Sequence, residues 1–289
     1  MAPKDFVGLT KPSRTRHRDS ADIISPTDTA PEFFIKDAFK LPTLLLFGSA
    51  IQIALSATLP PRVALLPAAL LALYALLTTA VQASYPITNT YMDGILPGRT
   101  SAQLPSPSTG HHGSAPAAHP IVVFHFGVRF NHPLGLLAPG VKSTIDHFVA
   151  CNKSIEGRAD AYGMLGLSPW RAAERGSNNT LMMMYYFRDV EGLNAFAHDE
   201  VHRKAWEFLV KAGYKHIGFF HEAFCVPPKA YESIYGNFPP FLMGAASVKC
   251  VDEGTGEETW VRPVVSAEVG SLRSQFGRMG RAFNETLNA

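Results

Sequence analysis

Two long runs without a charged residue, one directly after the other, constrain the fold of this 289-residue chain more than any other feature. The first lies between Lys40 and Arg62, and the second spans residues 63–83. A helix needs about 20 apolar residues to cross the hydrocarbon layer of a membrane, and each run is long enough. The proline pair within residues 59–62 favours a tight turn. We therefore predict a hairpin of two transmembrane helices over residues 41–84.

The charges that precede these runs predict their orientation. Residues 1–40 include the basic stretch KPSRTRHR and are rich in Pro, Ser and Thr, which indicates a disordered basic tail. Lys and Arg before the first span favour a cytosolic N-terminus, so two crossings return the rest of the chain to the cytosol. We expect the endoplasmic reticulum or another endomembrane as the location. A single crossing is the alternative, and it would expose the glycosylation sequons at Asn152, Asn178 and Asn284 to a lumen.

Composition divides the remaining chain into a linker, a domain and an extension. Residues 85–119 are assigned to a linker because they end in a Ser-, Pro-, Ala- and Gly-rich stretch without hydrophobic period. A folded domain is expected over residues 120–245 and a C-terminal extension over residues 246–289. The net charge is +2 and no basic block lies outside the tail, so nothing favours a nucleic-acid partner. Three widely spaced cysteines predict reduced thiols.

Hydrophobic periodicity within the domain predicts the order strand, helix, strand, strand, helix, strand. The strands are expected at 121–130, 162–170, 181–187 and 215–226, and the helices at 142–155 and 189–213. This is the α+β order of the ferredoxin-like βαββαβ fold, in which both helices cover one face of an antiparallel sheet. Alternation in the first strand places Val122, Phe124, Phe126, Val128 and Phe130 on one face. We expect this face to be left uncovered by the helices and to pack on a second copy, as a homodimer.

Histidines on apolar surfaces are the candidate functional residues. His125 and Arg129 share the second face of the first strand with Gly127, and this face is predicted to border a cavity. His198 and His202 are four residues apart within or beside the apolar arc of the second helix, so both are predicted to project into one pocket. Packed core histidines, and an Arg129 that reaches solvent from the strand end, are the alternatives. His147 lies off the apolar stripe of the first helix and is expected at the surface.

These residue types fit proton transfer in an apolar pocket. His202 or His198 would act as general base, because imidazole titrates near neutral pH. Arg129 would stabilise an oxyanion, and His125 would lie beside it on the floor of the pocket. The predicted substrate-binding walls are Trp206, Tyr185, Met183, Phe196 and His221.

Two common cofactor sites lack their sequence signals. The segment HDEVH at residues 198–202 has the histidine spacing of a helical zinc site, but Asp199 stands where those enzymes need Glu and no third ligand is obvious. No metal site is therefore predicted. Neither a GxGxxG fingerprint nor a P-loop occurs in the sequence, so no motif supports a nucleotide or flavin site.

Three segments resemble a known superfamily. They are IVVFHFGVRFNH at 121–132, MMYYFRDVEGLNAFAHDEVHRKAW at 183–206 and HIGFFHEAF at 216–224. Together they resemble the antibiotic-biosynthesis-monooxygenase superfamily of dimeric α/β barrels, and more closely its fungal, membrane-anchored members among secondary-metabolite enzymes. The resemblance implies a monooxygenase that oxidises an apolar polyketide, terpenoid or aromatic intermediate with O₂ as co-substrate.

The resemblance leaves the cofactor open. Cofactor-free relatives bind an electron-rich aromatic or polyene between sheet and helices, stabilise its anion and let it react with O₂. The aromatic residue and inward His of the family's second helix match Phe196 and His202. Haem-degrading relatives carry a Trp before this His and an Asn on the first strand, whereas here Trp206 follows the His and Asn131 ends the strand. A haem-dependent dehydratase or oxygenase and a non-catalytic membrane scaffold are the alternatives.

Overall fold

The computed structural model describes residues 5–16, 39–84, 89–172 and 180–281. The chain forms two compact units, which we describe separately. One unit is Phe39–Ile95, and the other combines Met1–Ala38 with Leu96–Ala289.

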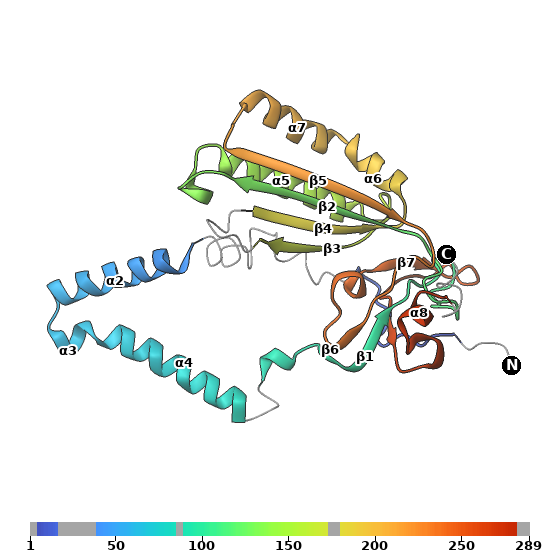
Figure 1. Ribbon diagram of the computed structural model, residues 1–289, viewed down its shortest axis with the longest axis horizontal. Coiled ribbons are helices and arrows are strands. Elements are labelled where there is room, and N and C mark those ends of the chain that lie inside the picture. The colour runs from blue at the N-terminus through green and yellow to red at the C-terminus, as the bar shows by residue number, and fades with distance from the viewer. Residues whose placement is uncertain (1–4, 17–38, 85–88, 173–179, 282–289) are drawn as a thin grey trace. The chain divides into compact units, whose positions relative to one another are not determined.

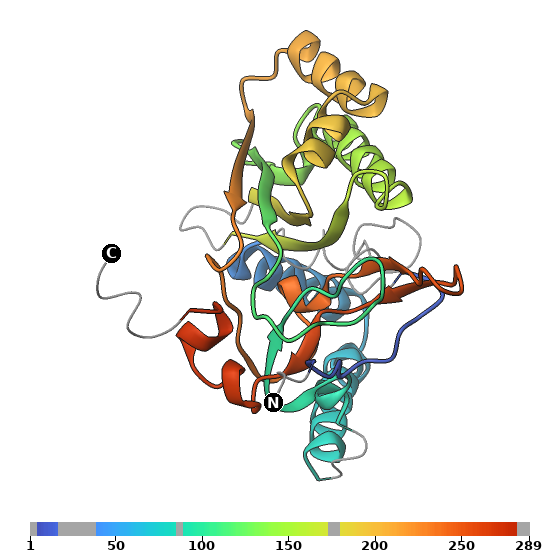
Figure 2. The same ribbon diagram turned by 90° about the vertical axis from the view of Figure 1, so that its right-hand side faces the viewer.

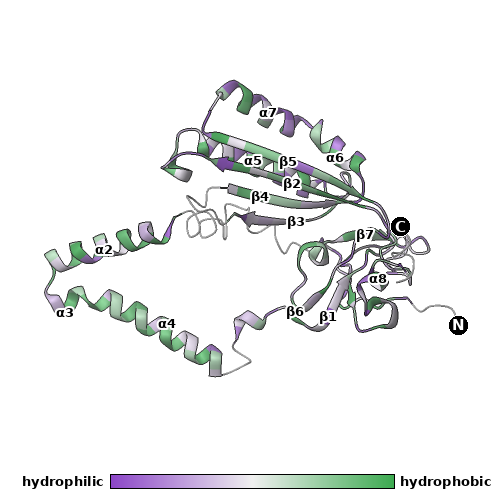
Figure 3. Cartoon of the chain, viewed as in Figure 1, coloured by the Kyte–Doolittle hydropathy of each residue, from purple (hydrophilic) through white to green (hydrophobic). Residues whose placement is uncertain are grey.

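The smaller unit consists mainly of two apolar helices. They are α2 (Leu41–Thr58) and α4 (Leu66–Ser84), joined through the short helix α3 (Pro61–Ala64), and η3 (Thr90–Met92) follows. The mean hydropathy is 1.5 over Leu41–Thr58 and 2.1 over the most apolar 18-residue window of Pro61–Ser84, and neither α2 nor α4 has a buried residue. Figure 3 shows the resulting apolar colouring. By length and composition both helices are candidate membrane spans at the predicted positions, while insertion itself stays a prediction.

The larger unit is built on a four-stranded antiparallel sheet. Its strands lie in the order β3-β4-β2-β5, and three helices cover one face (Figures 1 and 2). The elements are β2 (Ile121–Phe130), η4 (Gly135–Leu137), α5 (Val141–Gly157), β3 (Met164–Arg171), β4 (Thr180–Phe187), α6 (Val190–Ala197), α7 (Glu200–Ala212) and β5 (Ile217–Val226). This α+β arrangement is ferredoxin-like, as predicted.

The two faces of β2 are used in the opposite way from our prediction. The Phe-rich face packs under the helices, where the ring of Phe126 stacks on Phe148 of α5 with centroids 5.3 Å apart. The expectation that this face is uncovered is therefore wrong. Gly127 lies on the outer face and leaves no cavity there, because an added Cβ would lie 2.4 Å from the Phe220 ring. Arg129, near the strand end, is exposed.

The predicted second helix is two helices. The Asp189 carboxylate accepts a hydrogen bond from the Gly192 N–H at 2.8 Å and begins α6, which ends at His198. Asp199 then accepts from the Val201 N–H at 3.0 Å and begins α7. A second N-cap residue thus restarts the helix, and Gly213, with φ of 61°, ends it as predicted.

Residues that precede and follow the ferredoxin-like domain in sequence form a second group of short strands within the larger unit, which we call the β unit. Strand β1 (Leu96–Ala102) lies between β6 (Tyr235–Phe238) and β9 (Val264–Ser266), and β7 (Val248–Val251) pairs with β8 (Glu258–Val261). Its short helical turns are η5 (Leu242–Ala245), η6 (Gly270–Leu272) and α8 (Gln275–Arg278). The assignment of residues 85–119 to a linker is therefore wrong for β1. Small polar residues hid this strand, since Thr100 and Ser101 are buried in it.

Part of the N-terminal tail is also folded. Phe6 is buried, Gly8 forms a β-bridge with Val265, and Ser13 forms one with Trp260. Residues 5–16 therefore pack on the β unit, which corrects the prediction of a disordered tail for this segment. Residues 17–38 lie outside the described residues.

The β unit covers part of the outer sheet face. Ile121 and Tyr186 share a buried cluster with Val248 and Val261 of the unit. A second sheet does pack on the outer face, but the same chain supplies it at this end.

Candidate functional site

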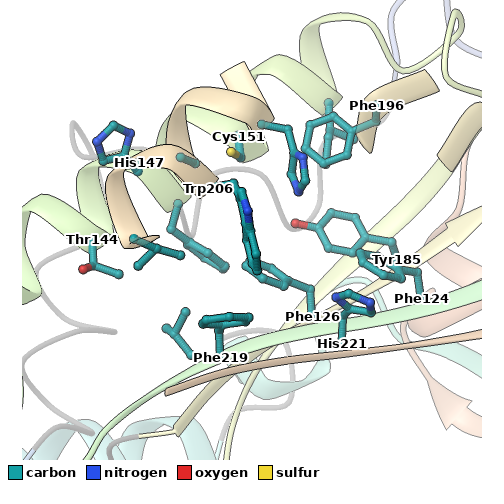
Figure 4. A pocket seen from close by; sticks show the side chains of 16 residues that line it. Phe124, Phe126, Thr144, His147, Cys151, Tyr185, Phe196, Trp206, Phe219 and His221 are labelled. Carbon is teal, nitrogen blue, oxygen red and sulfur yellow. The ribbon is translucent and has the colours of Figure 1, made fainter. Parts of the chain in front are cut away.

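A cavity of about 190 Å³ lies between the sheet and its covering helices (Figure 4). Aromatic and aliphatic side chains form most of its wall. The sheet contributes Phe124, Phe126, Val128, Tyr185, Phe219 and His221, and the helices contribute Thr144, His147, Phe148, Cys151, Ile155, Phe196, His202, Ala205, Trp206 and Leu209. Among these lining residues none carries a permanent charge. Such a wall suits an uncharged, largely apolar ligand.

His202 presents a defined nitrogen to this cavity. Its Nδ1 lies 2.8 Å from the backbone oxygen of Ala197. A carbonyl oxygen can only accept, so Nδ1 carries the hydrogen and Nε2 of the neutral ring keeps its lone pair. The ring also contacts Phe196 edge-on, with centroids 5.2 Å apart. His202 is therefore held as a proton acceptor in apolar surroundings.

Tyr185 supplies a neutral hydroxyl to the cavity wall. Its side chain is fully buried, and its hydroxyl donates a hydrogen bond to Asn152 Oδ1. The amide nitrogen of Asn152 in turn donates to the Phe148 carbonyl at 2.8 Å. Burial, together with nearby Cys151 and Glu156, raises the pKa of Tyr185 well above its ordinary value. The residue thus stays a phenol, and Figure 4 shows its hydroxyl directed towards the cavity.

The cavity reaches the surface between α7 and the edge strand β5. Trp206 is 50% exposed and Phe219 is 46% exposed, although both line the cavity. Their rings meet edge-on with centroids 5.2 Å apart. We call this opening between Trp206 and Phe219 the mouth.

Helix α5 contributes residues that sequence reasoning missed. His147 was expected at the surface but lines the cavity, with its ring 4.5 Å from that of Phe208. Cys151 also lines it, and burial followed by the charge of Asp199 raises the pKa of this thiol to about 11. The spacing of Thr144, His147 and Cys151 along one helix face is the signal that could have found them.

The two histidines of the HDEVH segment do not converge. His198 follows the last turn of α6, is exposed, and places its Nδ1 2.8 Å from the Asn194 carbonyl oxygen. It does not line the cavity, so the prediction that His198 and His202 share one pocket is wrong. The cause is the helix break at Asp199, which removes the four-residue spacing on a single helix.

Three other predicted site residues also lie away from the cavity wall. His125 is on the outer sheet face, with Nδ1 3.8 Å from a carboxylate oxygen of Glu222. Arg129 shares that face, and its Nε donates to Asn131 Oδ1 at 2.7 Å. The prediction that these two residues form the floor of the pocket is therefore wrong. Met183 is buried in the core on the cavity side without lining the cavity. The structure instead brings His202 together with Tyr185, Phe196, Trp206 and His221.

Comparisons with known proteins identify the family of the chain. The family profile described as Monooxygenase af470-like matches residues 121–243. The chain is 38% identical over 273 residues to Monooxygenase af470 of Aspergillus fumigatus, an alignment that covers 94% of this chain and 96% of the relative.

Two solved structures are similar at low identity. A dimeric ferredoxin-like protein from an uncultured marine organism is 19% identical, with coverage of 37% of this chain and 96% of that one and a TM-score of 0.28. A variant of SnoaB, a cofactor-independent oxygenase from Streptomyces nogalater, is 12% identical, with coverage of 36% and 90% and a TM-score of 0.25. The full-length relative from Aspergillus fumigatus decides the assignment, and the chain belongs to the monooxygenase af470-like family.

Proposed function

We propose that this chain is a membrane-anchored monooxygenase that oxidises an apolar small molecule in the cavity under α5, α6 and α7. Family membership supports the oxidoreductase activity, and the two candidate spans support the anchor. The observation that carries the proposal is the 2.8 Å contact between His202 Nδ1 and the Ala197 carbonyl oxygen, which leaves Nε2 as the proton acceptor of a residue that lines a cavity without fixed charge. A polyketide, terpenoid or aromatic intermediate of fungal secondary metabolism fits these surroundings.

The size of the cavity limits the substrate. Pockets for drug-sized ligands measure roughly 300–1,000 Å³, and this cavity measures about 190 Å³. The reacting part is therefore small, and a longer substrate would extend through the mouth. The rings of Phe124, Phe126 and Trp206 favour a flat, conjugated reacting part.

The proposed reaction needs no bound redox group. His202 Nε2 removes a proton from a C–H bond that conjugation has acidified, and the carbanion passes two electrons to O₂ as the C–O bond forms. Return of the proton gives a hydroperoxide, which loses water to leave a carbonyl. The balance is R₂CH₂ + O₂ → R₂C=O + H₂O, so the substrate supplies all the electrons.

Histidine side chains, and not Arg129 as we predicted, stabilise the negative charge in the proposed reaction. The protonated His202 stays beside the carbanion that it creates, and the attraction between opposite charges is strong where water is excluded. His147 and His221 also line the cavity and can donate hydrogen bonds to an anionic oxygen. Apolar walls without these donors would disfavour any anion.

Haem is a second candidate that His202 itself raises. A histidine whose Nδ1–H is bonded to a carbonyl also has the tautomer suited to metal ligation through Nε2. Haem carries two propionates, however, and no Lys or Arg occurs among the described residues that line the cavity. The lining therefore fits haem poorly, and we favour the cofactor-free reaction. A Soret band in the absorption spectrum of the purified protein would contradict this choice.

We further propose that the chain forms a homodimer through the outer sheet face. Beyond the part that the β unit covers, this face exposes Phe220 and Phe224 of the edge strand β5 at 37% and 49%. Clustered aromatics of this kind mark an interaction surface, and a second copy is the simplest partner. A monomeric mass by light scattering of the detergent-solubilised protein would contradict the dimer.

The decisive experiment compares two histidines that lie four residues apart in sequence. His202→Ala should lower O₂-dependent turnover in membranes that make the product by about 100-fold or more, because the general base is lost. His198→Ala is the matched control and should keep wild-type turnover, since His198 is exposed and outside the cavity. Full turnover by both variants would show that the site is wrong. No O₂-dependent turnover by the wild-type protein would favour the scaffold alternative.

A further inference from the structure

Exposed leucines and a valine gather at the end of the domain where β2 ends and β5 begins. Leu134 is 56% exposed, Leu137 is 72% exposed and Val210 is 64% exposed. Lys211 and Lys215 follow Val210 and are also exposed. We call these five residues the end surface.

Hydrogen bonds and a close ring contact hold the parts of the end surface together. The Asn131 N–H donates to the His216 carbonyl at 2.7 Å, and His216 Nε2 lies 2.9 Å from the Pro139 oxygen. Gly140 lies so close to the ring of Tyr214 that an added Cβ would be 2.3 Å from it. The loop that carries Leu134 and Leu137 is thus fixed against the segment that follows α7.

The end surface is continuous with the mouth of the cavity. Trp206 at the mouth is one helical turn before Val210 on α7, and Leu209 beside Val210 lines the cavity. On β5, Phe219 at the mouth lies four residues after Lys215. A ligand that leaves the mouth on this side therefore meets the exposed apolar side chains of the end surface.

The charge around these side chains is positive. Arg129 is exposed where β2 ends, and Lys142 at the start of α5 lies 2.8 Å from the carboxylate of Asp146. With Lys211 and Lys215 there are four cations around the end surface, against two acids, Asp146 and the exposed Glu207 of α7. Apolar side chains that project from loop and helix ends among Lys and Arg match an anionic lipid surface, which has acidic headgroups above hydrocarbon.

We infer that the end surface docks on the anionic lipid headgroups of the membrane, with Leu134, Leu137 and Val210 entering the interface. An apolar substrate then passes from the bilayer through the mouth into the cavity. This route rests on the proposed function, because it supplies the substrate of that reaction, but the docking itself is measured without turnover.

Spin labels on the full-length protein test the docking. The chain is reconstituted in vesicles of phosphatidylcholine with or without phosphatidylserine, with Cys225→Ser to remove the exposed thiol. A nitroxide is attached after Leu137→Cys or Val210→Cys, and after Glu253→Cys as a control in the exposed turn between β7 and β8. Labels at 137 and 210 should collide more with O₂ and less with an aqueous nickel chelate than the label at 253, most clearly with phosphatidylserine present.

Charge reversal provides the second measurement. Lys211→Glu and Lys215→Glu should each shift the ratio of docked to undocked label by about fivefold towards water, as expected for one cation near an anionic surface. Lys153→Glu, an exposed residue in the last turns of α5, should leave it unchanged. Labels at 137 and 210 that behave like the control at 253 would overturn the inference. Labels shielded from both O₂ and nickel would overturn it as well, because they would indicate a protein partner.

If His202→Ala abolishes turnover while the labels remain aqueous, the docking surface is wrong and the proposed chemistry stands. If the labels are exposed to lipid while the His202→Ala variant keeps full turnover, the docking surface stands and the proposed chemistry is wrong.

Discussion

At the cavity wall, the hydroxyl of Tyr185 and the amide of Asn152 satisfy each other. Both side chains are buried, and the amide is anchored in turn to the backbone of α5. A buried acceptor that loses its donor retains its full desolvation penalty. This link between β4 and α5 therefore stabilises the fold at the place where the substrate is proposed to bind.

Removing the Tyr185 hydroxyl should thus cost more stability than the change of one atom suggests. Tyr185→Phe leaves Asn152 Oδ1 without its donor, and we expect a loss of about 1–3 kcal/mol. Thermal unfolding of the detergent-solubilised protein measures it. Tyr91→Phe changes a side chain that is 85% exposed and should leave the midpoint unchanged. Equal midpoints for the two variants would contradict the assigned role of the hydroxyl.

The residues of β2 show where sequence reasoning reaches its limit. Alternation correctly separated its two faces, and the bounds of the strand were predicted as they are observed. Which face meets the helices depends on partners distant in sequence, and both faces are apolar enough to qualify. Gly127 suggested space for a ligand, whereas the Phe220 ring fills that space. The cavity positions of His202, Tyr185, Phe196, Trp206 and His221 were predicted, whereas the side of the sheet on which the Phe-rich face, His125 and Arg129 lie was not.

Among the elements, the break between α6 and α7 matters most for the site. Asp199 caps α7 and also binds Arg158 near the end of α5, with Nη2 and Oδ2 2.6 Å apart. No residue of α7 is fully buried, so the helix is held over the cavity by partly buried side chains such as Val201 and Ala205 together with this capping carboxylate. Two N-cap residues ten positions apart signal the break, but a continuous apolar arc conceals it.

The charge of Asp199 makes the attachment of α7 dependent on pH. Partial burial favours the neutral acid, but hydrogen bonds from Arg158, the Val201 N–H and Tyr162 outweigh it and lower the pKa of Asp199. A lowered pKa in the folded state means that the stabilisation is complete above the unfolded pKa of about 3.9 and is lost as the pH falls through the folded value. The protection of the α7 amides from hydrogen exchange should therefore decline only below about pH 4.

Two substitutions separate the cap from the charge. Asp199→Asn keeps a capping oxygen and loses the ion pair, which is worth about 0–1 kcal/mol at a partly exposed site. Asp199→Ala loses both and should cost about 0.5–2 kcal/mol more. Hydrogen exchange of the α7 amides, corrected for intrinsic rates, measures each effect. Asp189→Ala removes the cap of α6 instead and should spare α7, so equal loss of α7 protection in this control would refute the assignment.

For the whole molecule, the β unit and the N-terminal segment change how the chain is divided. The sequence predicted one domain between a tail and an extension, because β1, β6 and β9 are short and carry few alternating apolar residues. Their pairing brings together segments distant in sequence: Arg99 and Glu268 are 169 positions apart, and Arg99 Nη2 lies 2.9 Å from Glu268 Oε2. Local patterns do not encode such partners.

The docking of residues 5–16 has a consequence for the number of membrane crossings. Leu9 N–H donates to the Val264 carbonyl at 2.9 Å, and Arg16 donates to the Leu165 carbonyl at 3.2 Å. Groups that bond to each other occupy the same aqueous compartment, although the chain between them contains both candidate spans. Once inserted, residues 41–84 must therefore cross the bilayer an even number of times, whichever side the termini occupy.

An impermeant thiol reagent on sealed vesicles tests whether the number of crossings is even. Lys11→Cys and Glu253→Cys, both at exposed positions, should react to the same extent before lysis, and unequal reaction would mean an odd number of crossings. Glycan mapping is less informative at Asn152, because this residue is buried in α5. The sequons at Asn178 and Asn284 lie outside the described residues. If residues 41–84 insert, a tail that returns to bind the folded domain thus fixes the topology of that insertion, because the contacts of residues 5–16 form only when the chain has turned back to the same side.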